Sequence, residues 1–117
     1  FIGAANIIKG VARDANHVAF AGATLEVVGT RLAAGDTAAV AIRQHDIVLT
    51  AQAPQILRNV IPARVTRQVF LGATRDYLVE AADGSQLRVV TAPDNLVAEG
   101  TEVWLALPPE RCRALAR

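Results

Sequence analysis

One stretch of sequence, residues 61–90, decides the fold; it reads IPARVTRQVFLGATRDYLVEAADGSQLRVV. Apolar residues alternate with polar ones along residues 61–68 and again along residues 77–81. This period of two predicts strands with one buried face and one solvated face. Asp83-Gly84 tolerates the positive φ of a tight reversal, and residues 87–90 alternate again. The stretch therefore predicts a β-meander.

Working outward, short alternating segments separated by glycine-bearing turns fill the rest of the chain, which predicts an all-β barrel or sandwich. Gly35 and Gly100 each precede a similar pattern of strand, acidic residue and apolar segment, and this echo predicts two similar small lobes. We expect lobe-like halves of about 1–50 and 60–117, joined by a connector at 51–59. Pro54 could begin a short helix there, although an irregular connection is favoured.

Composition sets limits on the class of protein. The 117 residues suit one domain, 1–117, and the 52% hydrophobic content is enough for a hydrophobic core that needs no stabilising cross-links. A net charge of +1 gives no strong field to attract nucleic acid or an anionic membrane, and Cys112 has no second cysteine to pair with. No apolar run approaches the length that spans a bilayer, so direct membrane insertion is not expected.

Five segments occur in a characteristic order along the chain: FIGAAN at 1–6, VAIRQHDI at 40–47, VFLG at 69–72, YLVE with DG at 77–84, and LPPERC at 107–112. Taken together, they resemble the C-terminal TOBE (transport-associated OB) region of ABC-importer ATP-binding subunits, in the style of those serving iron, polyamine or phosphonate importers. One departure from the family pattern occurs where Arg43-Gln44-His45 stands in place of the usual arginine-proline-glutamate.

The resemblance implies an OB-type β-barrel that serves as a non-catalytic regulatory and dimerisation domain. It implies a homodimer, an importer permease complex as partner, and a cytoplasmic location peripheral to the inner membrane. ATP and magnesium would belong to a nucleotide-binding domain outside this sequence. The lack of methionine and the start at Phe1 predict that the chain is an excised or processed part of a longer protein.

No catalytic constellation is found in the sequence, and we predict that the chain itself is not an enzyme. The single lysine, Lys9, lacks the glycine-rich context of a P-loop. His17, His45 and Cys112 are too few for a closed zinc site of nitrogen and sulfur ligands. We interpret the histidines as solvated turn residues and the cysteine as a small hydrophobic residue. No cofactor or metal is therefore expected in this chain.

Two further function classes stay open. A small-ligand sensor could bind an oxyanion or similar solute through backbone amides and hydroxyls such as those of Thr66, Thr74 and Ser85. An oligonucleotide-binding OB module would need exposed stacked aromatics in a positive groove, and acidic residues dilute the central arginines, so no nucleic-acid partner is expected.

Two places are candidate interfaces. Trp104 lies on the opposite parity from Val103 and Leu105, which predicts an outward indole that either contacts a partner or is covered by the other lobe. Phe70 and Leu71 precede Gly72, where a bulge would turn their side chains toward a partner or close the barrel end.

Overall fold

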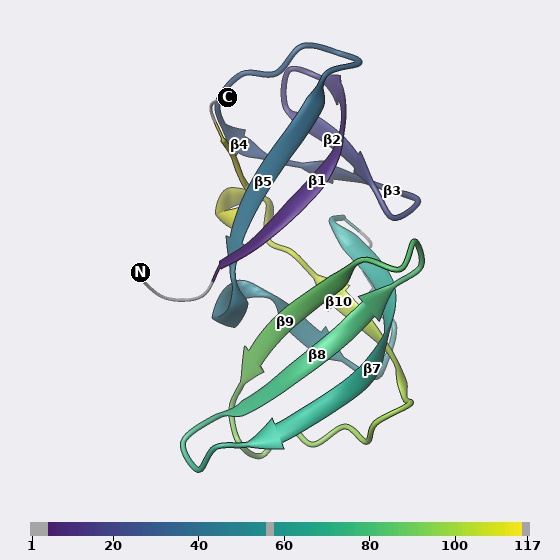
Figure 1. Cartoon of the computed structure of the whole chain (residues 1–117), viewed down its shortest axis with the longest axis vertical. Coiled ribbons are helices and arrows are strands. Elements are labelled where there is room, and N and C mark those ends of the chain that lie inside the picture. Colours follow the sequence, from purple (N-terminus) through teal and green to yellow (C-terminus); the bar gives the residue numbers. More distant parts are fainter. Residues whose placement is uncertain (1–4, 56–57, 116–117) are drawn as a thin grey trace.

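A computed structural model describes residues 5–55 and 58–115 of the chain. It is an all-β structure of two curled sheets, one above the other in Figure 1, with two short 3-10 helices at the junction between them. The helices are η1 (Gln44–Asp46) and η2 (Pro109–Arg111). This architecture confirms the prediction of a two-lobed, OB-type all-β fold.

The upper sheet has six strands, and β1 and β5 form its centre by antiparallel pairing from Ala5↔Arg43 to Val11↔Thr37. Gly10 is required on β1, because a Cβ there would lie 2.3 Å from the carbonyl oxygen of Ala19 on β2. In spatial order the strands are β3 (Ala23–Glu26), β2 (His17–Phe20), β1 (Ala5–Asp14), β5 (Thr37–Arg43), β11 (Arg113–Ala114) and β4 (Val28–Gly29).

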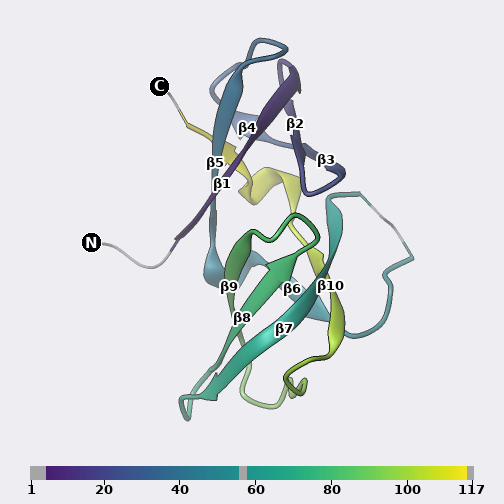
Figure 2. The same ribbon diagram turned by 45° about the vertical axis from the view of Figure 1, so that its right-hand side comes forward.

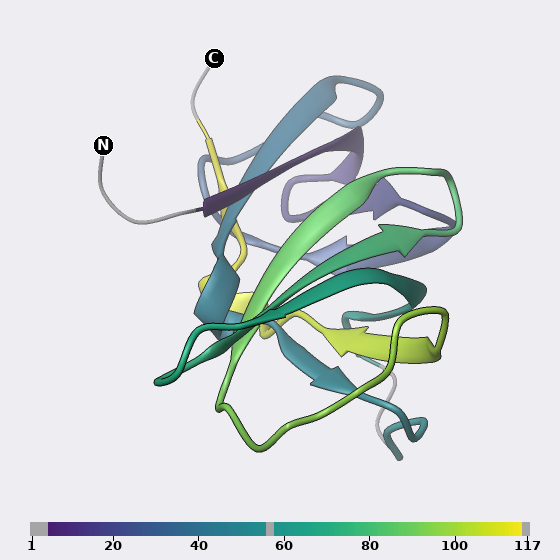
Figure 3. The same ribbon diagram turned by 60° about the horizontal axis from the view of Figure 1, so that its bottom comes forward.

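The lower sheet has five strands and contains the predicted meander. It curls so that its two edge strands, β6 and β9, approach each other (Figure 3). In spatial order the strands are β6 (Val48–Thr50), β10 (Glu102–Ala106), β7 (Val60–Phe70), β8 (Arg75–Ala81) and β9 (Gln86–Thr91).

The two halves of the sequence repeat one structural pattern, as their echo indicated. Each half contains four strands, a 3-10 helix and a last short strand that correspond in order. These elements are β1, β2, β3, β5, η1 and β6 in the first half and β7, β8, β9, β10, η2 and β11 in the second. The halves exchange their last strands: β6 pairs with β10 in the lower sheet, and β11 pairs with β5 in the upper sheet (Figure 2). Each sheet is therefore completed by a strand from the opposite half.

A continuous apolar core runs through both lobes, and Ile8, Val40, Val65 and Leu105 are all fully buried within it. The alternation along each strand explains this, because every second side chain points between the curled layers. No helix in the described ranges has the length and apolar character needed to cross a bilayer.

The expected position of the β-bulge is wrong. The bulge in β7 falls between Val65 and Arg67 and not at Gly72. Val65, which pairs with Val79 on β8 just before this shift, exchanges hydrogen bonds on its other side with the loop before β10, donating to Thr101 O and accepting from Gly100 N. The connector has no helix at 51–55 or 58–59, and the rest of the possible short helix, at 56–57, lies outside the described residues.

Candidate functional site

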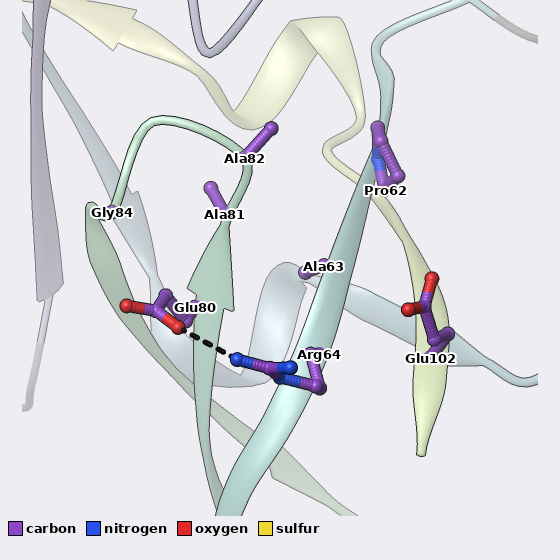
Figure 4. A pocket seen from close by; sticks show the side chains of 8 residues that line it. All are labelled: Pro62, Ala63, Arg64, Glu80, Ala81, Ala82, Gly84 and Glu102. Atoms are coloured by element: carbon purple, nitrogen blue, oxygen red, sulfur yellow. Dashed lines mark hydrogen bonds and ion pairs between the residues drawn. The ribbon is translucent and has the colours of Figure 1, made fainter. Parts of the chain in front are cut away.

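A surface groove with a volume of about 450 Å³ lies on the lower sheet (Figure 4). Among its lining residues, Ala63 on β7 pairs with Ala81 on β8, and both of these small side chains are buried. Pro62 forms one wall, and the turn after β8, through Ala82 and Gly84, forms another.

A row of three charged residues crosses this groove, one on each neighbouring strand. Arg64 on β7 pairs in register with Glu80 on β8 and with Glu102 on β10. The Arg64 guanidinium lies 3.4 Å from the Glu80 carboxylate, while Glu102 makes no ion pair among the described residues. All three are at least partly solvated, and exposed ion pairs of this kind contribute little energy. The groove offers shape and a carboxylate but no nucleophile with a base.

A second recess, of about 320 Å³, lies at the junction of the lobes between η1 and η2. Arg43, Arg111 and Arg113 line it together with two acids, Asp46 and Glu110. None of the three arginines forms an ion pair within the described ranges, so their guanidinium donors face water. The recess is chemically suited to an anionic group.

Trp104 points outward from the lower sheet, as its parity predicted. Val103 and Leu105 on either side are fully buried, whereas Trp104 is half-buried on the outer face. Its neighbours in register are Thr50 on β6 and Pro62 on β7. We define the Trp104 surface by the outward residues of these strands, which are Val48, Thr50, Val60, Pro62, Trp104 and Ala106.

Phe70 and Leu71 lie at the tip of the β7–β8 hairpin and are 57% and 56% exposed. The Arg75 guanidinium stacks on the Phe70 ring at 5.0 Å, and the same side chain donates to Gln68 Oε1 at 2.7 Å. Leu71 N donates to Thr74 O and closes the turn. The tip is thus an ordered apolar projection.

The structure does not bring the predicted interface residues into one patch. Trp104 pairs with Pro62 near the start of β7, and Phe70 is the last residue of the same strand. With the usual rise per residue of a β-strand, Trp104 and Phe70 therefore lie roughly 25 Å apart. Whether either surface binds a partner stays a prediction.

The hydroxyl groups named for an oxyanion site are likewise separated. Thr74 and Ser85 lie at opposite ends of β8, and the hydroxyl of Thr66 donates to Leu78 O. These three residues do not form one site.

Cys112 is fully buried, and burial raises the pKa of its thiol to about 11. A reactive thiolate needs the opposite shift, so the interpretation as a small hydrophobic residue fits this environment. His17 Nδ1 lies 2.8 Å from Asp14 Oδ1 at the solvated β1–β2 turn. Within the described residues no group of three or more histidine, cysteine or acidic side chains could hold a metal ion.

Sequence reasoning missed two buried asparagines that join the lobes. Asn59 has a left-handed φ of 54°, and its amide pairs with both the N–H and the carbonyl of Glu26. Asn6 pairs in the same way with Arg88. The available signal was that each asparagine stands two residues before a core isoleucine, Ile8 or Ile61, at the start of a repeated half.

The comparisons with known proteins agree with this fold. Residues 40–115 match the family model of the TOBE domain, and the chain belongs to that family. Among solved structures, a molybdate-bound crystal form of the cytoplasmic molybdate-binding protein ModG is similar, with a TM-score of 0.83 and 13% sequence identity over 96% of each chain. A search of curated proteins found no match.

Membership in the TOBE family confirms the resemblance drawn from the sequence. It also agrees with a binding or regulatory domain that has no catalytic role. At 13% identity, the similarity to ModG extends to the fold.

Proposed function

We propose that this chain is a non-catalytic regulatory and dimerisation domain of the ATP-binding subunit of an ABC importer, and that it lies on the cytoplasmic side, peripheral to the inner membrane. The observation that carries the proposal is the TOBE match over residues 40–115, together with the importer-subunit resemblance of the whole chain. ATP and magnesium would be bound by another domain, and the permease would be contacted through that assembly.

The complete gene product tests the importer assignment. We expect a P-loop and its associated ATPase motifs in the polypeptide that precedes Phe1. A gene product without a nucleotide-binding domain would contradict the importer assignment and favour an independent sensor.

Dimerisation is proposed to use the Trp104 surface. Trp104 combines a large aromatic side chain with apolar neighbours, and Val48 in the same surface is 54% exposed. Aromatic residues with apolar surroundings are typical of interface centres.

Sedimentation velocity tests this surface. Trp104→Ala should shift the protein toward monomer. Leu96→Ser should not, because this residue is 65% exposed on the loop between β9 and β10 and is not part of the Trp104 surface. Identical sedimentation of wild type and Trp104→Ala over a range of concentrations would remove the Trp104 surface from the proposal.

A second candidate function, the sensing of a small oxyanion, has a specific observation in its favour. ModG has this fold and is described as binding molybdate, and the η1–η2 recess of this chain presents Arg43, Arg111 and Arg113 without ion pairs in the described part. Charge-assisted hydrogen bonds from arginine suit such an anion.

Calorimetry with molybdate and sulfate tests sensing. Saturable heat that is lost in Arg111→Ala and kept in Arg67→Ala, a control on the lower sheet, would support it. Absence of any saturable heat, combined with a concentration-dependent dimer, would leave the regulatory proposal standing alone.

A further inference from the structure

The internal repeat allows the outer surfaces of the two sheets to be compared position by position. In the lower sheet, Pro62 pairs with Trp104, and Val60, Ala106 and Val48 share the next row. In the upper sheet, Lys9 pairs with Ala39, and Ile7, Ala41 and Arg113 share the next row. Equivalent positions therefore carry an apolar aromatic surface on one sheet and a basic surface on the other.

We call this second surface the basic face, and its members are Ile7, Lys9, Ala39, Ala41, Arg43 and Arg113. Ala39 and Ala41 form a low, half-buried centre on β5. Ile7 on β1 stands beside them with 52% of its surface exposed, and Val11 further along the strand is 50% exposed. The Ala41 end opens into the recess between η1 and η2.

The three charged members of this face, on β1, β5 and β11, are all basic. Lys9, Arg43 and Arg113 form no ion pair within residues 5–55 and 58–115. Two acids, Asp46 on η1 and Glu110 on η2, line the recess into which this face opens. Elsewhere on this protein, arginines such as Arg58 and Arg64 are paired with glutamates. Among the described residues, the three cations of the basic face thus lack the ion pairs that Arg58 and Arg64 make.

We propose that the basic face binds an acidic segment of a partner protein, one that carries apolar side chains among its carboxylates. Arginine presents a planar fork of donors that matches a carboxylate with two parallel hydrogen bonds. Two of the three cations are arginines: Arg113 lies in the same row as Ile7, and Arg43 lies in the next row on the same face. Small alanines at the centre let a backbone approach closely, while Ile7 and Val11 supply apolar contact.

A protein segment fits this face better than a lipid surface. Interfacial membrane binding typically uses aromatic anchors with a field of lysines, and the basic face has no aromatic residue and one lysine. Its half-exposed branched side chains and arginines instead match the composition of a protein interface, where arginine is enriched and charge complementarity selects the partner. The proposal does not depend on the importer assignment.

The test uses a fluorescent synthetic peptide that alternates glutamate and leucine as probe, with anisotropy as readout and NMR amide shifts as map. We expect saturable binding that weakens as salt is raised, because exposed charge pairs are screened. Shifts should concentrate on β1, β5 and β11. Arg43→Glu combined with Arg113→Glu should weaken binding roughly tenfold or more, since two favourable pairs become repulsive.

Matched control variants distinguish the effect of the basic face itself from the effect of the overall net charge. Arg67→Glu combined with Arg88→Glu changes the net charge equally but lies on β7 and β9 of the lower sheet, and it should bind like wild type. Ile7→Ser should also weaken peptide binding, whereas a simple anion site would keep its affinity for molybdate.

Three results would overturn the proposal. These are absence of saturable peptide binding, equal effects of the two double variants, and binding to phosphatidylserine-containing vesicles in preference to the peptide. The last outcome would reassign the basic face to a lipid surface. Circular dichroism of each variant establishes that the fold is retained before binding is compared.

Discussion

Asn6 and Asn59 occupy equivalent positions in the two halves of the chain, and each uses its side-chain amide to extend the hydrogen-bonding of a strand in the opposite lobe. Asn6 Nδ2 donates to Arg88 O at 2.7 Å, and Arg88 N donates to Asn6 Oδ1 at 2.9 Å. Asn59 makes the corresponding pair with Glu26, at 2.9 and 2.8 Å. The two lobes are thus fastened by two related pairs of polar contacts beside an apolar core.

Replacing Asn59 tests how much these contacts between the lobes contribute to stability. Its amide also donates to Leu107 O at 2.9 Å, and its φ of 54° strains a residue that carries a Cβ. We expect Asn59→Ala to lower the free energy of unfolding by about 3 kcal/mol, from unpaired buried groups and left-handed strain. Urea denaturation measures this loss.

Asn59→Gly is the matched variant, because glycine adopts the same φ without strain but lacks the amide. It should recover about 1 kcal/mol of the Asn59→Ala loss. Equal stability of wild type and both variants would show that the amide contacts contribute nothing to joining the lobes.

The strand exchange predicts that the two sheets unfold together. Trp104 belongs to the lower sheet, and Val40 is fully buried in the upper one. Val40→Ala should therefore shift the Trp104 fluorescence transition to lower denaturant by the equivalent of about 1–3 kcal/mol, the cost of a buried cavity. A Trp104 transition that stays unchanged while the upper-sheet amides lose protection would mean that the sheets unfold separately.

The thiol of Cys112 predicts a loss of stability in alkali. Its pKa is raised from 9.0 to about 11, so the folded state holds the proton that the unfolded chain releases. This contribution is complete below pH 9 and declines as the pH rises from 9 toward 11. Comparing wild type with Cys112→Ser across this window isolates the thiol, and the wild type should lose about 2 kcal/mol more than the serine variant. Parallel pH profiles would contradict the burial of the thiol.

Tyr77 shows how one hydroxyl holds the loop before β10. Its OH donates to Asn95 O and accepts a hydrogen bond from Val97 N at 2.8 Å. Tyr77→Phe leaves the buried Val97 amide without an acceptor, and we expect a loss of about 1–2 kcal/mol together with faster amide exchange at Val97. The exposed tip residue Phe70 is the control, because Phe70→Ser should change stability by less than about 1 kcal/mol.

Much of this fold could be predicted because its strands alternate cleanly. The central meander and the outward direction of Trp104 follow from a period of two, which fixes the face of each side chain. The repeat of the halves follows from the similar patterns after Gly35 and Gly100. The TOBE resemblance rested on the order of several weak motifs, and their spacing was preserved along the chain.

The strand exchange could not be predicted in the same way. β6 and β11 have three and two residues, and each is preceded by a 3-10 helix, at which the chain crosses to the other sheet. Segments this short have too few residues for their apolar-polar alternation to favour one sheet over the other. Pairing over long sequence separation is decided by the packed core, and the same holds for the contacts of Asn6 and Asn59.

The basic face was missed for a related reason. Lys9, Arg43 and Arg113 come from three segments far apart in the sequence, and the near-zero net charge of the whole chain conceals a local excess. Their shared parity on β1, β5 and β11 becomes meaningful once the registers Ile7↔Ala41 and Arg113↔Ala41 are known.

The crossing of β6 and β11 makes each half of the chain the complement of the other. In each half, the last strand does not pair with the sheet of its own half and pairs instead with the sheet of the other half. Two identical chains exchange strands in the same way in a domain-swapped dimer. The connector at 51–59 places both complements in one molecule, so their encounter is intramolecular and its yield does not depend on protein concentration.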